Sequence, residues 1–272
     1  MKKTLLPLIA LVASQLAVAQ MKEGKVVYEN IQQLNFQVRG GGPDMPELPK
    51  SITRQFELLF SSNQSLWQPL ADLNQEANQM AGPSGGPNVN FVRIGGGDAV
   101  TYHNFEKGIR VSERELPAKT FLVEEPITKL NWKLTDESKA ILGHKAFKAT
   151  ADRISTRMVV NMENGQTSRK EVPDTSKIVA WFAADIPVPA GPDFQGQLPG
   201  LILELDINNG RTIYRALELS PKVNASAIKA PSRGKKVSAE EYAKEQTKMM
   251  DQMMQNRGGR GDGQRVTITA QQ

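Results

Sequence analysis

The sequence of 272 residues contains no cysteine and only two histidines, His103 and His144. The absence of cysteine excludes disulfide bonds, thiol catalysis and thiolate metal sites. Two histidines so far apart in the sequence would need carboxylates to complete a zinc site, so we predict no metal centre of the usual kind and no cofactor. A body of roughly 200 residues buries enough apolar surface to be stable without disulfides.

Long hydrophobic runs are also absent, except near the N-terminus. Two lysines open the chain and an apolar stretch follows them, which is too short to span a membrane. Ala17-Val18-Ala19 then matches the small-x-small pattern of a signal peptidase site. We therefore predict that residues 1–19 are a signal peptide, cleaved near Ala19-Gln20. The mature protein would be periplasmic or secreted and would have no transmembrane segment.

The formal net charge of +5 does not describe the body of the protein. Residues 20–220 contain 22 Lys and Arg against 24 Asp and Glu, whereas residues 221–272 contain 10 against 5. A body so close to neutral has no excess of positive charge with which to bind nucleic acid. We predict no nucleic-acid partner and a basic C-terminal tail.

What residues 20–220 do contain is a series of short segments rich in β-branched and aromatic residues, separated by Gly, Pro and Asn. This spacing, without long helical periods, predicts a single, mainly β domain: a curved antiparallel sheet, with an open half-barrel as one form it could take. Residues 201–205 and 212–219 are predicted to form a hairpin about the turn at Asn208-Asn209-Gly210. The charged residues 164–176 are predicted to be a loop.

One helix is predicted, in the tail, at about residues 238–256. Ser238 and Glu241 have the spacing of a capping box, and Gly258-Gly259 would end the helix. Beyond it the Gly- and Gln-rich end of the chain is predicted to be disordered. Four methionines recur on one face of this helix. They are a weak candidate Cu(I) site, although an apolar stripe that docks the helix is the simpler interpretation; they are Met249, Met250, Met253 and Met254.

The most informative segment is residues 178–205, in which two apolar runs flank a bend dense in Pro and Gly. Proline fixes φ and removes an amide donor, so this bend is predicted to be a rigid surface loop or sheet edge. It is either an architectural lock or the wall of a binding groove, and the sequence leaves both open. The candidate binding residues are Trp181, Asp185, Pro187, Gly191, Pro192, Leu198, Pro199, Gly200 and Glu204.

No catalytic residue is predicted. Glu204 and Asp206 flank Leu205 at the spacing of a strand, so both carboxylates would share one face, and a solvated face explains them more simply than acid–base chemistry. We therefore predict that the protein is not an enzyme.

Several motifs, in order, resemble those of the GLPGLI family of exported proteins typical of Bacteroidetes. They are GKVVYE (residues 24–29), LFSSNQSLW (59–67), NWKL (131–134), ILGHK (141–145), AWF (180–182) and LPGLILE (198–204). Gln197 and Ala146 depart from the family pattern. The resemblance implies an exported protein with a β-rich fold, and it brings no established activity and no catalytic residue.

Together these observations predict an exported, non-catalytic protein of the cell envelope that binds an apolar or lipid-like ligand, a peptide or an outer-membrane partner. The alternatives are a structural or assembly accessory without a ligand groove and, less favoured, a hydrolase of unfamiliar design.

Overall fold

The fold is a single twelve-stranded sheet with one α-helix in the part of the chain that the computed structural model describes. Residues 1–19 and 258–272, predicted as signal peptide and tail end, lie outside that part. The described residues are 20–33, 50–70, 100–117, 119–163 and 166–257, and for 157–163, 166–171 and 253–257 only the backbone is described. The elements are β1 (Gly24–Gln33), β2 (Ser51–Ser61), β3 (Gln64–Pro69), β4 (Thr101–Asn104), β5 (Ile109–Leu116), β6 (Lys119–Pro126), β7 (Lys133–Ile141), β8 (His144–Glu163), β9 (Gln166–Ala183), β10 (Leu201–Ile207), β11 (Thr212–Ser220), the short 3-10 helix η1 (Ala225–Ala227), β12 (Lys235–Val237) and α2 (Ala239–Arg257).

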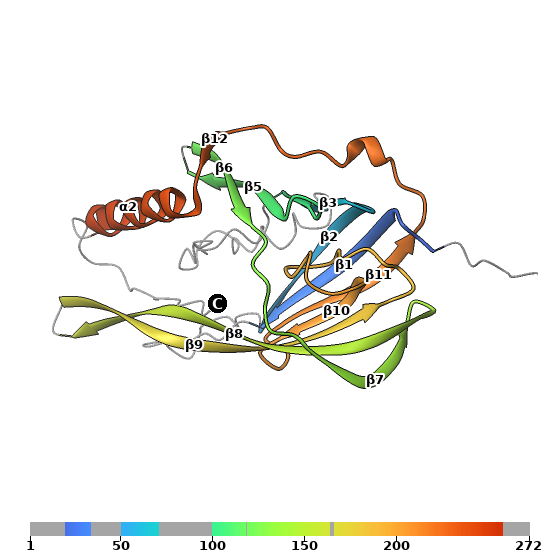
Figure 1. Cartoon of the computed structure of the whole chain (residues 1–272). Helices are drawn as coiled ribbons and strands as arrows, with labels where there is room; N and C mark the ends of the chain where they lie inside the picture. Colours follow the sequence, from blue (N-terminus) through green and yellow to red (C-terminus); the bar gives the residue numbers. More distant parts are fainter. Residues whose placement is uncertain (1–19, 34–49, 71–99, 118, 164–165, 258–272) are drawn as a thin grey trace, which may run out of the picture.

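The strand order is β12-β6-β5-β4-β3-β2-β1-β11-β10-β9-β8-β7. All neighbours are antiparallel except β12 and β6, which are parallel. The sheet curves strongly without closing, so β6 and α2 lie above the long β8–β9 hairpin (Figure 1). The predicted fold class, a curved antiparallel sheet with one helix, is confirmed.

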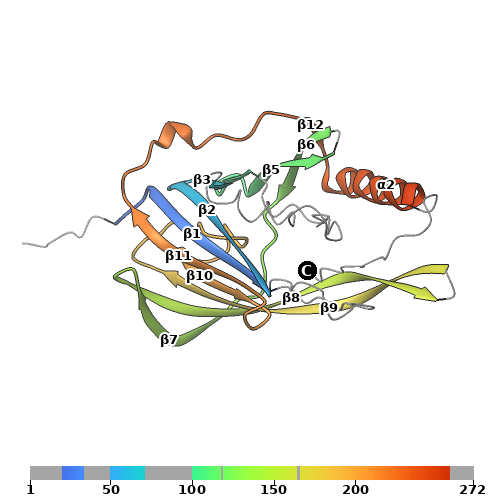
Figure 2. The ribbon, with the colours of Figure 1, turned by 180° about the vertical axis from the view of Figure 1, so that it is seen from behind.

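The β8–β9 hairpin corrects one sequence prediction. Residues 164–176 were expected to be a loop, but Gln166 onward belongs to β9 and pairs with β8 as far as the tip. Beyond Ala151 the two strands pair only with each other among the described strands, and they project as a two-stranded ribbon (Figure 2). Residues 166–176 are mostly polar or charged and lack alternating apolar residues, so they gave no strand signal.

The predicted β10–β11 hairpin and the predicted helix are confirmed. Asn208 and Asn209 have left-handed backbone, with φ of 59° and 53°, and the carboxylate of Asp206 accepts a 2.6 Å hydrogen bond from the amide of Gly210. Asn and Gly adopt left-handed backbone at a low cost in conformational energy, so Asn208, Asn209 and Gly210 suit this turn. At the helix, the amide of Glu241 donates to Oγ of Ser238 (3.2 Å), and the amide of Ser238 donates back to the Glu241 carboxylate (3.0 Å).

Between β11 and β12 the chain forms a strap, residues 221–234, over the convex face of the sheet (Figure 1). Ile228 is buried there against Leu59 and Leu66 of β2 and β3. Arg233 forms ion pairs with Glu113 and Glu115 of β5. The strap thus carries the chain to the far edge of the sheet, where β12 joins β6.

The Pro- and Gly-dense bend, residues 184–200, packs into the concave face. Its Ile186 and Val188 join one apolar core with Tyr28 and Phe56, and its Phe194 joins a second core, on β9 and β10. The bend therefore fills the apolar half of the concave face with its own side chains.

A β-bulge explains how three consecutive apolar residues of β10 are all buried. The register of β10 with β9 shifts between Ile202 and Glu204, which leaves Leu203 as the extra residue. Leu201, Ile202 and Leu203 are 0%, 1% and 0% exposed. A regular strand would point alternate side chains to opposite faces, and the extra residue breaks that alternation.

Candidate functional site

The other half of the concave face is polar. Strand register places His103, Arg110 and Glu125 in one row across β4, β5 and β6, and Thr101 and Ser112 in the neighbouring row. These rows continue across β3 to Trp67 and Ser65 on the face that the bend covers.

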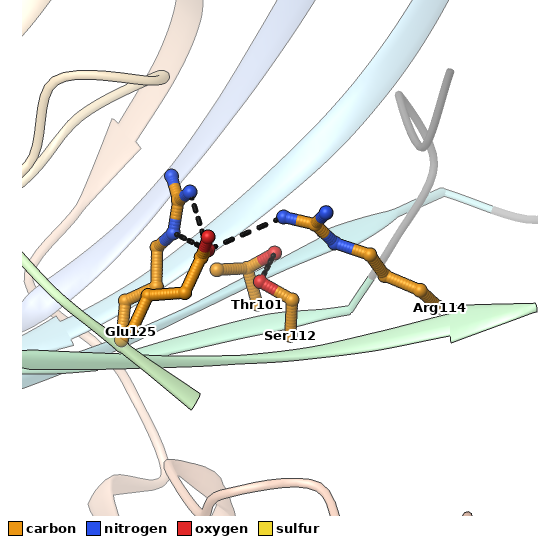
Figure 3. Close-up of polar contacts among 5 residues, drawn as sticks. Thr101, Ser112, Arg114 and Glu125 are labelled. Carbon is orange, nitrogen blue, oxygen red and sulfur yellow. Dashed lines mark hydrogen bonds and ion pairs between the residues drawn. The ribbon is translucent and has the colours of Figure 1, made fainter. Parts of the chain in front are cut away.

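Two arginines and one carboxylate form the centre of this polar half (Figure 3). Oε2 of Glu125 accepts hydrogen bonds from Nε and Nη2 of Arg110, at 2.9 and 2.6 Å, and from Nη2 of Arg114, at 3.3 Å. The hydroxyl groups of Thr101 and Ser112 lie 3.5 Å apart beside them. Charge-assisted bonds of this kind fix the guanidinium groups in orientation.

Helix α2 holds the second arginine from the other side. The guanidinium carbon of Arg114 lies 5.2 Å from the ring centroid of Tyr242, within the range of a cation–π contact. Tyr242 itself packs edge-on against Phe121 of β6, with ring centroids 5.7 Å apart. The predicted tail helix therefore forms part of the wall of the polar half.

The bend contributes a carboxylate, Asp193, to the same place. Asp193 has left-handed backbone with φ of 53°, and the residues on either side of it, Pro192 and Phe194, are buried and hold it there. The hydroxyl of Tyr214 donates a hydrogen bond to Asp193, and the charges of Arg153 and Arg110 act on it.

The carboxyl of Asp193 is recessed but open to water. Its withdrawal from bulk water raises the pKa, while Arg153, the hydrogen bond from Tyr214 and Arg110 oppose that rise. The residue is nonetheless exposed to solvent. Asp193 is thus exposed to solvent while two arginines and Tyr214 act on its charge.

The two arginines that act on Asp193 come from distant parts of the sheet. Arg110 is on β5 and Arg153 is on β8, and β4, β3, β2, β1, β11, β10 and β9 lie between them in strand order. Curvature of the sheet is what brings them together. We call this group the arginine cluster; it consists of Arg110, Arg114, Glu125, Arg153, Asp193 and Tyr214.

His103 lies beside the cluster as a neutral, buried ring. Burial, together with the neighbouring charge of Arg110, lowers the pKa of His103 to about 3. Its ring stacks on Phe105 at 6.3 Å, and Nδ1 is buried without a hydrogen-bond partner among the described residues. The side chain therefore adds no charge to the site near neutral pH.

The candidate residues predicted from the sequence do not form one site. Trp181 and Glu204 are paired neighbours on the convex face, opposite the arginine cluster. Nζ of Lys139 lies 4.4 Å from the Trp181 ring centroid and 2.8 Å from the Glu204 carboxylate. Lys148, at 5.9 Å, covers the same ring.

Three further candidates lie at the rim of the bend. Asp185, Pro187 and Pro199 are exposed, and the carboxylate of Asp185 lies 2.7 Å from Nδ1 of His144. Among the described residues, these three side chains contact neither Trp181 nor a common partner.

The remaining candidates of the bend, Gly191, Pro192, Leu198 and Gly200, are buried. A Cβ on Gly191 would lie 2.5 Å from Cβ of Ile202, and one on Gly200 would collide with the backbone carbonyl of Ala183. Both glycines are therefore required by close packing.

Gln197, at a position where the sequence departs from the GLPGLI pattern, also ties the bend down. Its Oε1 accepts bonds from the amide of Leu130 (2.9 Å) and from Nε1 of Trp132 (3.0 Å). The bend is thus anchored to the segment that leads into β7.

Of the four methionines, Met249 and Met250 are half-buried, and the side chains of Met253 and Met254 lie outside the described residues. The described residues contain no group of three or more His, Asp or Glu arranged to hold a metal ion. Nor does any described helix combine the length and apolar character needed to cross a bilayer.

Sequence reasoning missed the arginine cluster, although part of its signal was present. Arg110, Ser112 and Arg114 alternate along one strand and must share a face. Nothing local connects that strand to Arg153 or Asp193, because their approach depends on the curvature of the whole sheet.

Similarity to known proteins is limited. No curated protein matches the sequence. Two solved structures of PNGF-II, in space groups C2 and P21, are 16% identical with a TM-score of 0.48; they cover 83% and 84% of this chain and 33% and 34% of their own. The chain thus spans about a third of PNGF-II. A crystal structure of LprF from Mycobacterium bovis is 9% identical, covering 79% of this chain and 92% of its own, with a TM-score of 0.25. These likenesses are too distant to support a conclusion.

Residues 132–204 match the model of a family described as a protein of unknown function, Porph_ging.

Proposed function

We propose that the protein is an exported, non-catalytic binding protein of the cell envelope, and that the polar half of its concave face receives the ligand, a peptide or a lipid-like molecule. The main observation is the hydrogen-bonded group of Arg110, Arg114 and Glu125 on that face, with Asp193 of the bend close enough to Arg110 for their charges to interact. Recessed polar groups that converge in a concave face are typical of binding sites.

The division of the concave face supports this location. Ile186, Val188 and Phe194 occupy the apolar half, so a ligand meets the bend there rather than an open groove. The polar half has charged groups that water can reach, including the Arg110 side chain, which is 37% exposed. The bend is then both a lock for the core and, through Asp193, one wall of the site.

A binding role accounts for these groups better than a catalytic one. The carboxylates of Glu125 and Asp193 are already engaged by arginines and by Tyr214, and His103 is buried and neutral. Residues 82–86, GPSGG, have the spacing of a nucleophile elbow but lie outside the described residues. They also lack the apolar strand that such an elbow requires before it.

Export is part of the proposal. It rests on the predicted signal peptide of residues 1–19 and on the resemblance to GLPGLI proteins, whose naming motif falls inside the matched residues 132–204. A cell fractionation that found the mature N-terminus near Gln20 outside the cytoplasm would support it, and a full-length cytoplasmic protein would contradict it.

The binding role is tested by purifying the full chain from its native envelope and analysing what accompanies it by mass spectrometry. We expect a bound molecule in the wild type and its depletion from Arg153→Gln. Arg215→Gln is the matched control, because Arg215 pairs with Glu29 on the convex face at 3.8 Å. Wild-type protein that is repeatedly empty would contradict the proposal.

An assembly accessory is the second candidate, favoured by helix α2. The helix contacts the sheet near Tyr242, while Lys244, Thr247 and Lys248 are exposed and free to meet another protein. This candidate predicts a crosslinked envelope partner that is lost when residues 238–256 are deleted, with no small molecule in the wild-type protein.

A further inference from the structure

The arginine cluster has more hydrogen-bond donors than its own carboxylates can accept. Two guanidinium groups, those of Arg110 and Arg114, share one carboxylate, that of Glu125. With that carboxylate ionised, the three side chains carry one net positive charge. Arginine cannot lose its proton to relieve this excess.

Part of the excess is visible as an unused donor. Nε of Arg153 is buried and has no hydrogen-bond partner among the described residues. A buried donor without an acceptor is costly, because it has lost its bond to water.

Glu125 shows how the cluster holds an anion. A single oxygen, Oε2, accepts all three hydrogen bonds from Arg110 and Arg114, and the carboxylate side chain is only 18% exposed. Glu125 thus occupies the position that a ligand oxygen would prefer, and it competes with such an oxygen for both guanidinium groups.

We propose that Arg110 and Arg114 bind one oxyanion group of the ligand, a carboxylate or a phosphate, with Glu125 as its internal competitor. This inference rests on the proposed binding function and names the chemistry of its charged contact. Planar guanidinium groups bind both kinds of oxyanion through paired N–H donors. A metal cation is disfavoured, because it would have to enter beside two arginines.

The competitor makes the site testable without knowledge of the whole ligand. Removing its charge by Glu125→Gln keeps the side-chain shape and frees the arginines, so we expect phosphate or acetate to bind about tenfold more tightly. Glu29→Gln on the convex face makes the same change in net charge next to Arg215 and should leave the affinity unchanged.

Binding is measured by isothermal titration of the full chain with sodium phosphate and with sodium acetate, at an ionic strength fixed with chloride. If Glu125→Gln binds only phosphate more tightly than the wild type does, the ligand carries a phosphate group. If it binds only acetate more tightly, the ligand carries a carboxylate. Equal affinity changes in Glu125→Gln and Glu29→Gln would show a general charge effect and overturn the site.

A second variant covers the case in which Glu125→Gln fails to fold. Arg110→Gln should weaken binding of the same anion at least several-fold relative to the wild-type chain, and an unchanged affinity would overturn the inference. The two proposals also fail separately. If a ligand accompanies the native protein but neither anion binds, the oxyanion site is wrong and the binding function stands. If an anion binds and the native protein is always empty, the binding function is wrong.

Discussion

The hydroxyl of Tyr28 on β1 donates a 2.6 Å hydrogen bond to the carbonyl oxygen of Ile202 on β10, across the intervening strand β11. Ile202 is the residue at which the register of β10 shifts, so its carbonyl is available for a partner outside the regular ladder. Tyr28 is fully buried, and burial raises the pKa of its hydroxyl, which therefore stays protonated as a donor. One side chain thus fixes the bulge that buries three consecutive apolar residues.

Removing this donor should destabilise the protein. We expect Tyr28→Phe to lower the free energy of unfolding by about 1–3 kcal/mol, because the Ile202 carbonyl remains buried without its bond. The measurement is denaturant unfolding. Tyr102→Phe is the control: Tyr102 donates to Gln64 at 2.8 Å in a part-buried position, where water can replace the bond. Equal losses in the two variants would contradict a special role for Tyr28.

Gly200 should tolerate no side chain. Gly200→Ala is expected to cost about 1–3 kcal/mol of stability or more, because its Cβ would meet the Ala183 backbone, which cannot give way as a side chain can. Gly143, with φ of 80° and no atom within 4 Å of its would-be Cβ, provides the comparison. Gly143→Asn should be nearly neutral, since Asn adopts left-handed backbone. A stable Gly200→Ala protein would argue against the bend as a lock.

The buried His103 should make stability depend on pH. Its pKa is about 3 when folded and about 6.5 in an unfolded chain, so the unfolded chain binds the extra proton between those values. Its contribution is complete above pH 6.5 and is lost as pH falls towards 3, by up to about 1.4 kcal/mol per pH unit. The measurement is chemical unfolding of wild type and His103→Gln at several pH values. Parallel curves for the two proteins would contradict the expected proton uptake.

Two neighbouring aromatic residues should differ because they face opposite sides of the sheet. Phe182 is 4% exposed and packs on the concave side, so Phe182→Ala should lower the free energy of unfolding by about 3–5 kcal/mol. Trp181 is half-buried beneath Lys139 and Lys148, so Trp181→Ala should lower the free energy of unfolding clearly less and should not alter ligand binding. Loss of the bound ligand in a folded Trp181→Ala protein would move the site to the convex face.

Docking of helix α2 should depend on the Tyr242 ring. Tyr242→Ala removes its contacts with Phe121 and Arg114, so we expect limited proteolysis to release the tail after Val237 sooner than in the wild type. Tyr242→Phe keeps the ring and should resist proteolysis as the wild type does. If the Phe and Ala variants are cleaved alike, another contact holds the helix.

The elements that the sequence predicted correctly are those specified by neighbours along the chain. The capping box of Ser238 and Glu241 and the turn at Asn208-Asn209-Gly210 are satisfied by bonds within a few residues, so their residue types alone identify them. The fold class followed in the same way from the spacing of short strands. Trp181 was a candidate binding residue together with residues of the bend, but its side chain lies on the other face because side chains alternate along β9.

The arginine cluster could not be predicted by the same means. Its members come from β5, β6, β8, β11 and the bend. Their positions relative to one another depend on the strand order, the register and the curvature of the whole twelve-stranded sheet. Arg153 is followed by residues of the ribbon, and nothing in the local sequence indicates that it lies near Asp193. Asp193 reads in the sequence as one more polar residue in a proline-rich loop.

The parallel pairing of β12 with β6 has a consequence for how the protein is made. Lys235–Val237 come from the last quarter of the chain, so the outer edge of β6 has no described strand beside it until synthesis is nearly complete. An uncovered strand edge readily recruits strands from other molecules. A chain that stops short of residue 235 would keep that edge open, and self-association would begin there.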